Sequence, residues 1–185
     1  MSEPVVSSAG EDRNLRRWRL TLTVAAWLLI AQSALSVITG LVAIALAPIA
    51  DPGTMLGQLG PLGPLIDRSS IALLDTLMRQ IAVVNRIQTV ASLILLAGSV
   101  GLLLRKKWGW YTVVAVHVAA AVAVFIWVMP MFETLYRALD PSSAGTMALV
   151  MAILGALGPA GVVAFLLLRP VVSQFQQQGS RIPGV

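Results

Sequence analysis

The segment Leu103–Trp110, "LLRKKWGW", sets three cationic side chains and two tryptophans between two long apolar runs. One run covers residues 87–104, and the other covers residues 109–129. A bilayer core about 30 Å thick needs about 20 apolar residues in helical conformation. Both runs are close to that length, so the basic segment is predicted to form a tight turn between two antiparallel membrane spans.

The composition also indicates a membrane protein. Of the 185 residues, 57% are hydrophobic and only 11% are charged, and the mean hydropathy is +0.85. Soluble domains are about 45–50% apolar and about 25% charged. A soluble fold of this length could not bury so much apolar surface, so the membrane class is favoured before any motif is considered.

Two further apolar runs, at residues 20–47 and 146–168, bring the predicted number of spans to four. None of the four contains aspartate, glutamate, lysine or arginine. The first run is longer than the roughly 7–15 apolar residues of a signal peptide, so we expect an uncleaved anchor. The predicted fold is all-α: an integral membrane four-helix antiparallel bundle forming one domain over residues 20–168, with short tails at 1–19 and 169–185.

The distribution of cationic residues predicts the orientation of the spans. Arginine and lysine collect on the cytoplasmic side of membrane proteins, and here they gather in both tails and in the basic segment. On the opposite side, arginines are balanced by acidic residues. Both tails are therefore expected in the cytoplasm, and Trp108, Trp110 and Tyr111 in the headgroup region of a cell inner membrane. This orientation accounts for the net charge of +5, so no nucleic-acid partner is expected.

The predicted turn resembles a hairpin of many uncharacterised small four-span bacterial integral membrane proteins. In that hairpin an apolar span ends in two or three basic residues plus tryptophan, here "RKKWGW", and continues at once into the next span. The resemblance covers residues 87–129 and implies a membrane protein of the same architecture. It implies no catalytic residue for this chain.

The longest segment between spans, residues 48–86, is predicted to form an outer loop followed by an amphipathic helix. Its first part is rich in glycine and proline, which favours irregular structure. Four charged residues then share one helical line at about 100° per residue: Arg68, Asp75, Arg79 and Arg86. The helix either lies flat on the outer leaflet and bends near Asn85, or extends the second span as one rod.

The charged line and Asn85 form the first candidate contact surface. The helix either covers the bundle with this face in solvent or uses it to dock a partner protein. Asp75 precedes Arg79 by four residues, the favourable order for a helical ion pair. Arg86, with Asn85, can also reach a lipid phosphate at the membrane edge.

Alanines spaced by four predict a close contact between the third and fourth spans. Because the hydrophobic effect does not draw helices together in lipid, small residues that allow close packing are important there. The two rows are Ala115, Ala119 and Ala123 in the third span and Ala144, Ala148, Ala152, Ala156, Ala160 and Ala164 in the fourth. The alternative is that an alanine-rich composition produces the spacing by chance.

Two residues within the spans are candidates for a functional role. Pro159, in the fourth span, is expected to kink or loosen its helix. His117 is the single histidine and lies about 12 Å inside the third span at about 1.5 Å per residue. An ionisable group at that depth is a functional candidate. It can be a neutral imidazole bonded to a neighbouring span, a quinone or lipid contact, or a haem ligand whose second histidine comes from another chain.

Polar side chains in the first two spans, such as Ser33 and Thr89, are expected to hydrogen-bond between helices. No span contains a carboxylate, which argues against a carrier coupled to protons or sodium through a buried acid. No catalytic or nucleotide-binding motif is present, and there is no cysteine. We therefore expect no enzymatic activity, no metal site and no cofactor.

The leading hypothesis is a non-enzymatic membrane subunit or scaffold. It would act through helix–helix contacts with a membrane protein partner or with copies of itself. The second hypothesis is a bundle that binds a quinone, haem or lipid at His117. The third is a channel or carrier that works as an oligomer.

Overall fold

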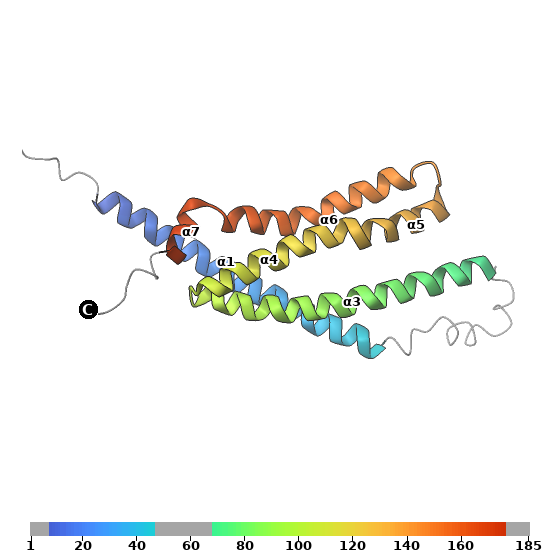
Figure 1. Cartoon of the computed structure of the whole chain (residues 1–185), viewed down its shortest axis with the longest axis horizontal. Coiled ribbons are helices and arrows are strands. Elements are labelled where there is room, and N and C mark those ends of the chain that lie inside the picture. Colours follow the sequence, from blue (N-terminus) through green and yellow to red (C-terminus); the bar gives the residue numbers. More distant parts are fainter. Residues whose placement is uncertain (1–7, 47–67, 177–185) are drawn as a thin grey trace, which may run out of the picture.

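The structure is a computed structural model that describes residues 8–46 and 68–176, and this part of the chain is all-α, as predicted. Figure 1 shows long helices running side by side, with a short one, α7, across one end. The elements are α1 (Ser8–Leu46), α3 (Arg68–Leu103), α4 (Lys107–Ala123), the π-helix η2 (Val124–Val128), α5 (Met129–Leu139), α6 (Ala144–Leu166) and α7 (Arg169–Gln176). The outer loop expected at the start of segment 48–86 lies outside the described residues.

Four helical segments are long and apolar enough to cross a membrane. They are Arg16–Leu46, Asp75–Leu103, Lys107–Ala138 and Ala144–Leu166. Each overlaps one predicted span. The second and third segments are longer than predicted, because the helix continues beyond the apolar run at the end away from the basic turn.

The amphipathic helix and the second span form one rod. Helix α3 runs without interruption from Arg68 to Leu103, through Asn85. Of the two forms left open by the sequence, this is the continuous one. The predicted ion pair is confirmed: Arg79 Nε donates to Asp75 Oδ2 at 3.0 Å. Both side chains are exposed, so the pair adds little to stability.

The third span also continues past its predicted end at Met129. A proline in a regular α-helix lacks an N–H, and its ring collides with the carbonyl four residues earlier. Just before Pro130 the chain widens into the π-helix η2, where the Met129 N–H reaches back five residues to Val124 O. The wider turn accommodates Pro130 at the start of α5, so the helix reaches Leu139.

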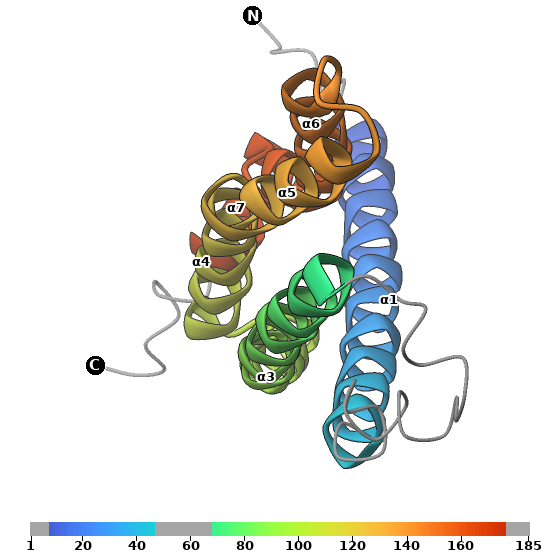
Figure 2. The same cartoon turned by 90° about the vertical axis from the view of Figure 1, so that its right-hand side faces the viewer.

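The long helices pack mainly on their neighbours in sequence. Helix α1 packs on α3, α3 on α4, and both α4 and α5 on α6, while α7 returns to contact α1, α4 and α6. Figure 2, along the molecule, shows α3 beside α1 and α5 beside α6. Helix α7 thus links the first helix of the chain to the last two spans.

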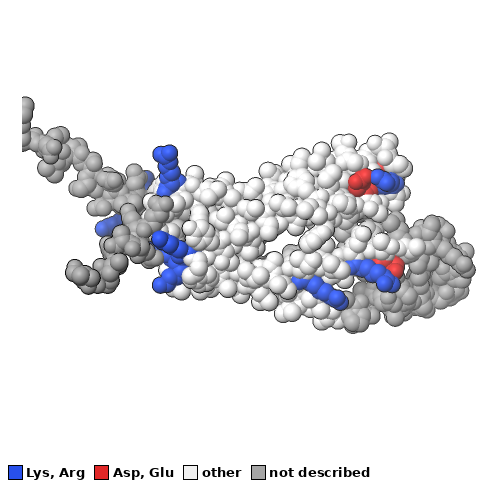
Figure 3. Space-filling view, in the orientation of Figure 1, with Lys and Arg blue, Asp and Glu red and all other residues white. Residues whose placement is uncertain are grey.

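The charged side chains that the structure describes lie mostly at the two ends of the molecule (Figure 3). We call the end with the α3–α4 turn the basic end and the opposite end, with the α5–α6 turn, the far end. The described charges of the basic end are Arg16, Arg17, Arg19, Arg105, Lys106, Lys107 and Arg169; those of the far end are Asp75, Arg79, Glu133, Arg137 and Asp140.

The main hydrophobic core lies near the basic end, where five helices meet. Its buried residues are Leu22, Ala26 and Leu29 of α1, Leu102 of α3, Val113 of α4, Leu166 of α6, and Val171 and Phe175 of α7. The amphipathic α7 supplies two of these side chains. The predicted tail over residues 169–185 therefore begins with a helix that belongs to the core.

Candidate functional site

The basic turn has a defined geometry that ends α3 and starts α4. Arg105 has φ 59°, a left-handed conformation that favours glycine. The Arg105 N–H bonds to Leu102 O at 2.9 Å, and the Lys106 N–H bonds to Gly101 O at 2.8 Å. This pair of bonds is the Schellman motif, which satisfies carbonyls at a helix C-terminus. Helix α4 then starts at Lys107.

Glycines let the two helices touch through their backbones next to this turn. A Cβ on Gly109 would lie 2.3 Å from the carbonyl carbon of Gly101 and 2.5 Å from Leu102 N. A Cβ on Gly101 would lie 2.7 Å from the Trp108 ring. The sequence analysis did not identify this contact. Glycines on both sides of a predicted tight turn were the available signal.

Trp110 joins the start of α4 to the end of α6. Its indole Nε1–H donates to Leu166 O at 3.0 Å, a carbonyl at the α6 C-terminus with no partner of its own in the helix. Its ring lies edge-on to Tyr111 at 4.9 Å between centroids and 6.4 Å from Phe175. The Trp110 ring thus packs against the core, a contact that the sequence analysis did not predict.

Helix α7 covers this tryptophan with its apolar face. Val171 and Phe175 are buried in the core, and Gln174 is buried beside them. Gln174 Nε2 donates to Pro170 O at 3.3 Å, while its Oε1 is buried without a hydrogen-bond partner in the described structure. The position of α7 thus depends on apolar packing more than on hydrogen bonds.

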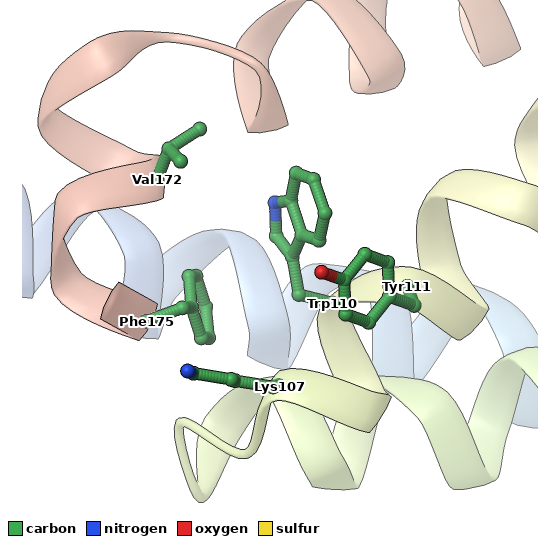
Figure 4. Close-up of a pocket in the computed structure, with 5 residues that line it drawn as sticks. All are labelled: Lys107, Trp110, Tyr111, Val172 and Phe175. Atoms are coloured by element: carbon green, nitrogen blue, oxygen red, sulfur yellow. The ribbon is translucent and has the colours of Figure 1, made fainter. Parts of the chain in front are cut away.

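A cavity of about 370 Å³ opens between α4 and α7 at the basic end. Its walls are Lys107, Trp110, Tyr111, Val172 and Phe175. Figure 4 shows Lys107 extending from the start of α4 toward Phe175, with Trp110 and Tyr111 on the α4 side and Val172 on the α7 side. The arrangement combines one cation with aromatic and aliphatic walls.

A second hollow of about 410 Å³ lies toward the far end, between α3 and the η2–α5 segment; we call it the outer groove. It is lined by Arg79, Gln80, Val83, Val84, Ile126, Trp127, Pro130, Met131 and Thr134. Of the predicted contact residues whose side chains the structure describes, Asp75, Arg79, Asn85 and Arg86, only Arg79 lines it. Arg68 begins α3, Asp75 pairs with Arg79, Asn85 is half-buried and Arg86 is exposed.

His117 is buried, with 6% of its surface exposed. Its Nδ1 lies 2.8 Å from Val113 O, one turn earlier in the same helix. Because a carbonyl only accepts, Nδ1–H is the donor in this bond. Within the described residues, no group of three or more metal-ligating side chains is present.

The expected hydrogen bonds between helices are replaced by bonds within each helix. Ser33 donates to Leu29 O at 2.6 Å, Thr89 to Asn85 O at 2.7 Å and Ser99 to Leu95 O at 2.7 Å. A hydroxyl can always reach the carbonyl four residues earlier without needing a neighbouring helix. Thr89 also lies at a close contact between α1 and α3: a Cβ on Gly40 would lie 2.0 Å from Thr89 Oγ1.

The two alanine rows do not form the contact that was expected between the third and fourth spans. Ala144, Ala148 and Ala152 are buried and Ala156 is half-buried, but Ala160 and Ala164 are exposed. In the third span Ala115 and Ala119 are exposed and Ala123 is half-buried. The buried row of α4 is instead Gly109, Val113 and His117. Spacing by four occurs on several faces of a helix, and the contact at the turn decides which face of α4 points inward.

Pro159 does not interrupt its helix: α6 is continuous from Ala144 to Leu166.

Asp140 accepts several hydrogen bonds at the α5–α6 turn of the far end. Its carboxylate accepts bonds from the Ser142 N–H at 3.0 Å, from Ser142 Oγ at 2.6 Å and from Ser143 Oγ at 2.7 Å. These bonds, with the Ser142 and Ser143 hydroxyls contributing most, lower the pKa of Asp140 below its ordinary value of 3.8.

Comparison with protein-family models, with curated proteins and with solved structures found no match for this chain. Function is therefore inferred from the chemistry and placement of its own residues.

Proposed function

We propose that this protein is a multi-pass membrane protein whose basic end faces the cytoplasm. Residues 87–104 of the second span carry no charge, and at about 1.5 Å per residue they extend about 27 Å. This length matches a hydrocarbon core of about 30 Å. Figure 3 shows the corresponding uncharged band between the two ends. At the basic end the structure describes cationic side chains but no acidic ones, whereas at the far end it describes both. By the positive-inside rule, this distribution favours a cytoplasmic location for the basic end and therefore for both termini.

In this orientation α3 and α5 extend beyond the membrane on the outer side. The part of α3 before Arg86 and the whole of α5 lie past the uncharged band. The outer groove lies where these extensions begin: Val83 belongs to the extension of α3, while Ile126 and Trp127 belong to η2, at the outer end of the third apolar run. These three side chains are 54%, 60% and 48% exposed. Apolar walls of this kind at an aqueous boundary are typical of a protein contact surface.

The function that this geometry supports best is a non-enzymatic membrane subunit or scaffold. The outer groove is the observation that carries the proposal: the described helices leave it uncovered. We infer that an apolar segment of a membrane partner, or of a second copy, occupies it. Arg79, beside Gln80 and Thr134, supplies polar groups at the same groove to orient such a segment.

Affinity purification in mild detergent tests this proposal. Val83→Lys puts a charge in the outer groove, whereas Ile81→Lys, two residues away on a different face of the same helix, leaves the groove unchanged. We expect a stoichiometric partner, or a defined oligomer of the chain, with the wild type and with Ile81→Lys but not with Val83→Lys. Recovery of a monomer alone from wild-type membranes would argue against a subunit.

Membrane insertion and orientation are tested separately. We expect the protein to remain in the membrane after extraction at alkaline pH. A tag placed at either terminus should be protected in intact spheroplasts and become accessible after their lysis. Release by alkali, or a terminus accessible from outside, contradicts the topology.

A further inference from the structure

We propose that the cavity between α4 and α7 at the basic end binds the phosphate group of an anionic amphiphile. A phospholipid headgroup is the form in which a membrane offers this chemistry. The inference goes beyond a subunit function, since it needs no protein partner. It concerns Lys107, Tyr111 and the apolar walls around them.

The cavity has the size and the mixed lining of a small-molecule site. Its volume of about 370 Å³ lies within the range of about 300–1,000 Å³ usual for ligand pockets. Its walls come from segments far apart in sequence, α4 and α7. The cavity therefore exists only when α7 is folded back on α4, as Figure 4 shows.

The donors that remain available point to an anion. The Trp110 N–H is already bonded to Leu166 O, which leaves the Lys107 ammonium and the Tyr111 hydroxyl as the polar groups of the lining side chains. A lysine ammonium is a common point-charge partner of phosphate. Arg169, the first residue of α7, is a further cation of the basic end, but Lys107 is the one that lines the cavity.

No described acidic side chain competes for these cations. Asp75 lies near the start of α3, Glu133 in α5 and Asp140 at the α5–α6 turn, so all three belong to the far end. In Figure 3 the red side chains accordingly appear at that end. The described ion pairs, Asp75–Arg79 and Glu133–Arg137, are also there. An anion at the basic end therefore meets positive charge that no described acidic side chain neutralises.

The remaining walls suit the part of an amphiphile next to its phosphate. Trp110, Val172 and Phe175 present aromatic and aliphatic surface beside Lys107. Inorganic phosphate has no apolar group to place there, whereas a glycerol backbone with acyl chains does. The apolar run of the third span begins at Gly109, two residues after Lys107 and beside Trp110, so the cavity lies where that run starts. In the proposed orientation the cavity thus lies at the level of the cytoplasmic headgroups.

The test must separate a site from general attraction, because each cation near an anionic surface contributes about 1 kcal/mol whether or not it forms a pocket. Lys106 and Lys107 are adjacent and both exposed, but only Lys107 lines the cavity. Lys107→Gln and Lys106→Gln therefore each remove one positive charge, but only Lys107→Gln removes a residue that lines the cavity. Val172→Trp fills the cavity and leaves the charge unchanged.

The measurement is native mass spectrometry of the purified full chain in detergent, titrated with phosphatidylglycerol or phosphatidylcholine. We expect saturable phosphatidylglycerol binding by the wild type, unchanged in Lys106→Gln and about tenfold weaker in Lys107→Gln, the factor for about 1.4 kcal/mol. Phosphatidylcholine, with no net charge, should bind at least tenfold more weakly. Inorganic phosphate that displaces the lipid at millimolar concentration would identify phosphate itself as the ligand, and no displacement would identify the lipid.

Equal affinity of the two lysine variants, or equal binding of the two lipids, would overturn the proposal. Retained helicity is checked by circular dichroism for each variant. If Val172→Trp does not fold, Lys107→Gln still decides, because Lys107 is exposed and not needed for packing. Since binding is measured on the purified chain, its failure is distinct from loss of a partner, and alkaline extraction tests the membrane location separately.

Discussion

The basic end and the far end of the molecule are built differently. At the basic end, α1, α3, α4, α6 and α7 contribute to one buried core, and Trp110 bonds across it to α6. Toward the far end the outer groove opens between α3 and α5, and the described ion pairs each join two residues of the same helix.

This difference shows which end of the molecule has a core that its own described helices bury. Near the basic end a short amphipathic helix, α7, adds Val171 and Phe175 to the buried core. No described element covers the outer groove in the same way. We therefore expect substitutions at the basic end to change stability most, and substitutions in the groove to change association.

The largest effect is expected from Gly109→Ala. The new Cβ would lie within 2.6 Å of three backbone atoms of Gly101 and Leu102, so α3 and α4 must separate, at a loss of about 3 kcal/mol. Gly161→Ala is the matched control, because nothing lies within 4 Å of its Cβ. Thermal unfolding in detergent, followed by circular dichroism, measures both. Equal stability of the two variants would mean that the helices do not touch at the turn.

Ala152→Leu tests packing away from the basic core. Ala152 is fully buried, with 0% of its surface exposed, and overpacking at such a site costs about 2 kcal/mol. Ala164→Leu, at an exposed position of the same row, should be nearly neutral. The same unfolding assay compares them. If both are neutral, the contact of α6 with the third span is looser than the structure indicates.

Trp110→Phe should destabilise the basic end by about 1.5 kcal/mol, since it removes the donor to Leu166 O and leaves that carbonyl unpaired. Trp27→Phe serves as the control because Trp27 is 57% exposed. The two midpoints of unfolding give the comparison. An equal loss in both variants would exclude a special role for the indole N–H.

Arg105→Gly should raise stability by about 1 kcal/mol, because glycine adopts a positive φ without strain. Lys106→Gly should have the opposite sign, since Lys106 is extended with φ −78° and glycine there only adds freedom to the unfolded chain. Unfolding of the two variants under identical conditions checks the sign. A loss of stability in Arg105→Gly would contradict the left-handed turn.

The smallest effect is expected from Asp140 at the far end. Because folding lowers its pKa, the carboxylate adds stability that is complete above about pH 3.8, the ordinary value, and is lost as the pH falls through the lower folded pKa. Unfolding of the wild type and of Asp140→Asn, followed from pH 5 downward, should show a small difference that disappears in acid. A difference that is constant with pH would exclude the carboxylate charge as its cause.

Several features could be predicted because they depend on residues close together in the sequence. Hydropathy over about 20 residues identified all four apolar helices, and the spacing of Asp75 and Arg79 predicted their ion pair. The cavity between α4 and α7 could be predicted only in part. The basic turn was identified, but Val172 and Phe175 lie more than 60 residues after it, in a segment predicted as a tail.

The contacts between helices depended on information that periodicity does not contain. The alanine row of the third span is as regular as that of the fourth, yet Ala115 and Ala119 are exposed while Ala148 and Ala152 are buried. Likewise, Ser33 and Thr89 bond within their own helices. A single sequence shows which faces are able to pack, not which of them meet.

By itself, the sequence determined the class of this protein: four long apolar helices, a basic turn between the second and third, and a one-sided excess of cations. Each of these properties depends on the residue types within a short stretch of sequence, so no knowledge of distant contacts is needed. The tertiary structure alone decided that Gly109, Val113 and His117 form the inward face of α4, that Trp110 bonds to α6, and that α7 folds back to form a cavity of about 370 Å³ with α4. Such choices depend on close contact between distant segments, where one Cβ or one carbonyl determines which arrangement fits.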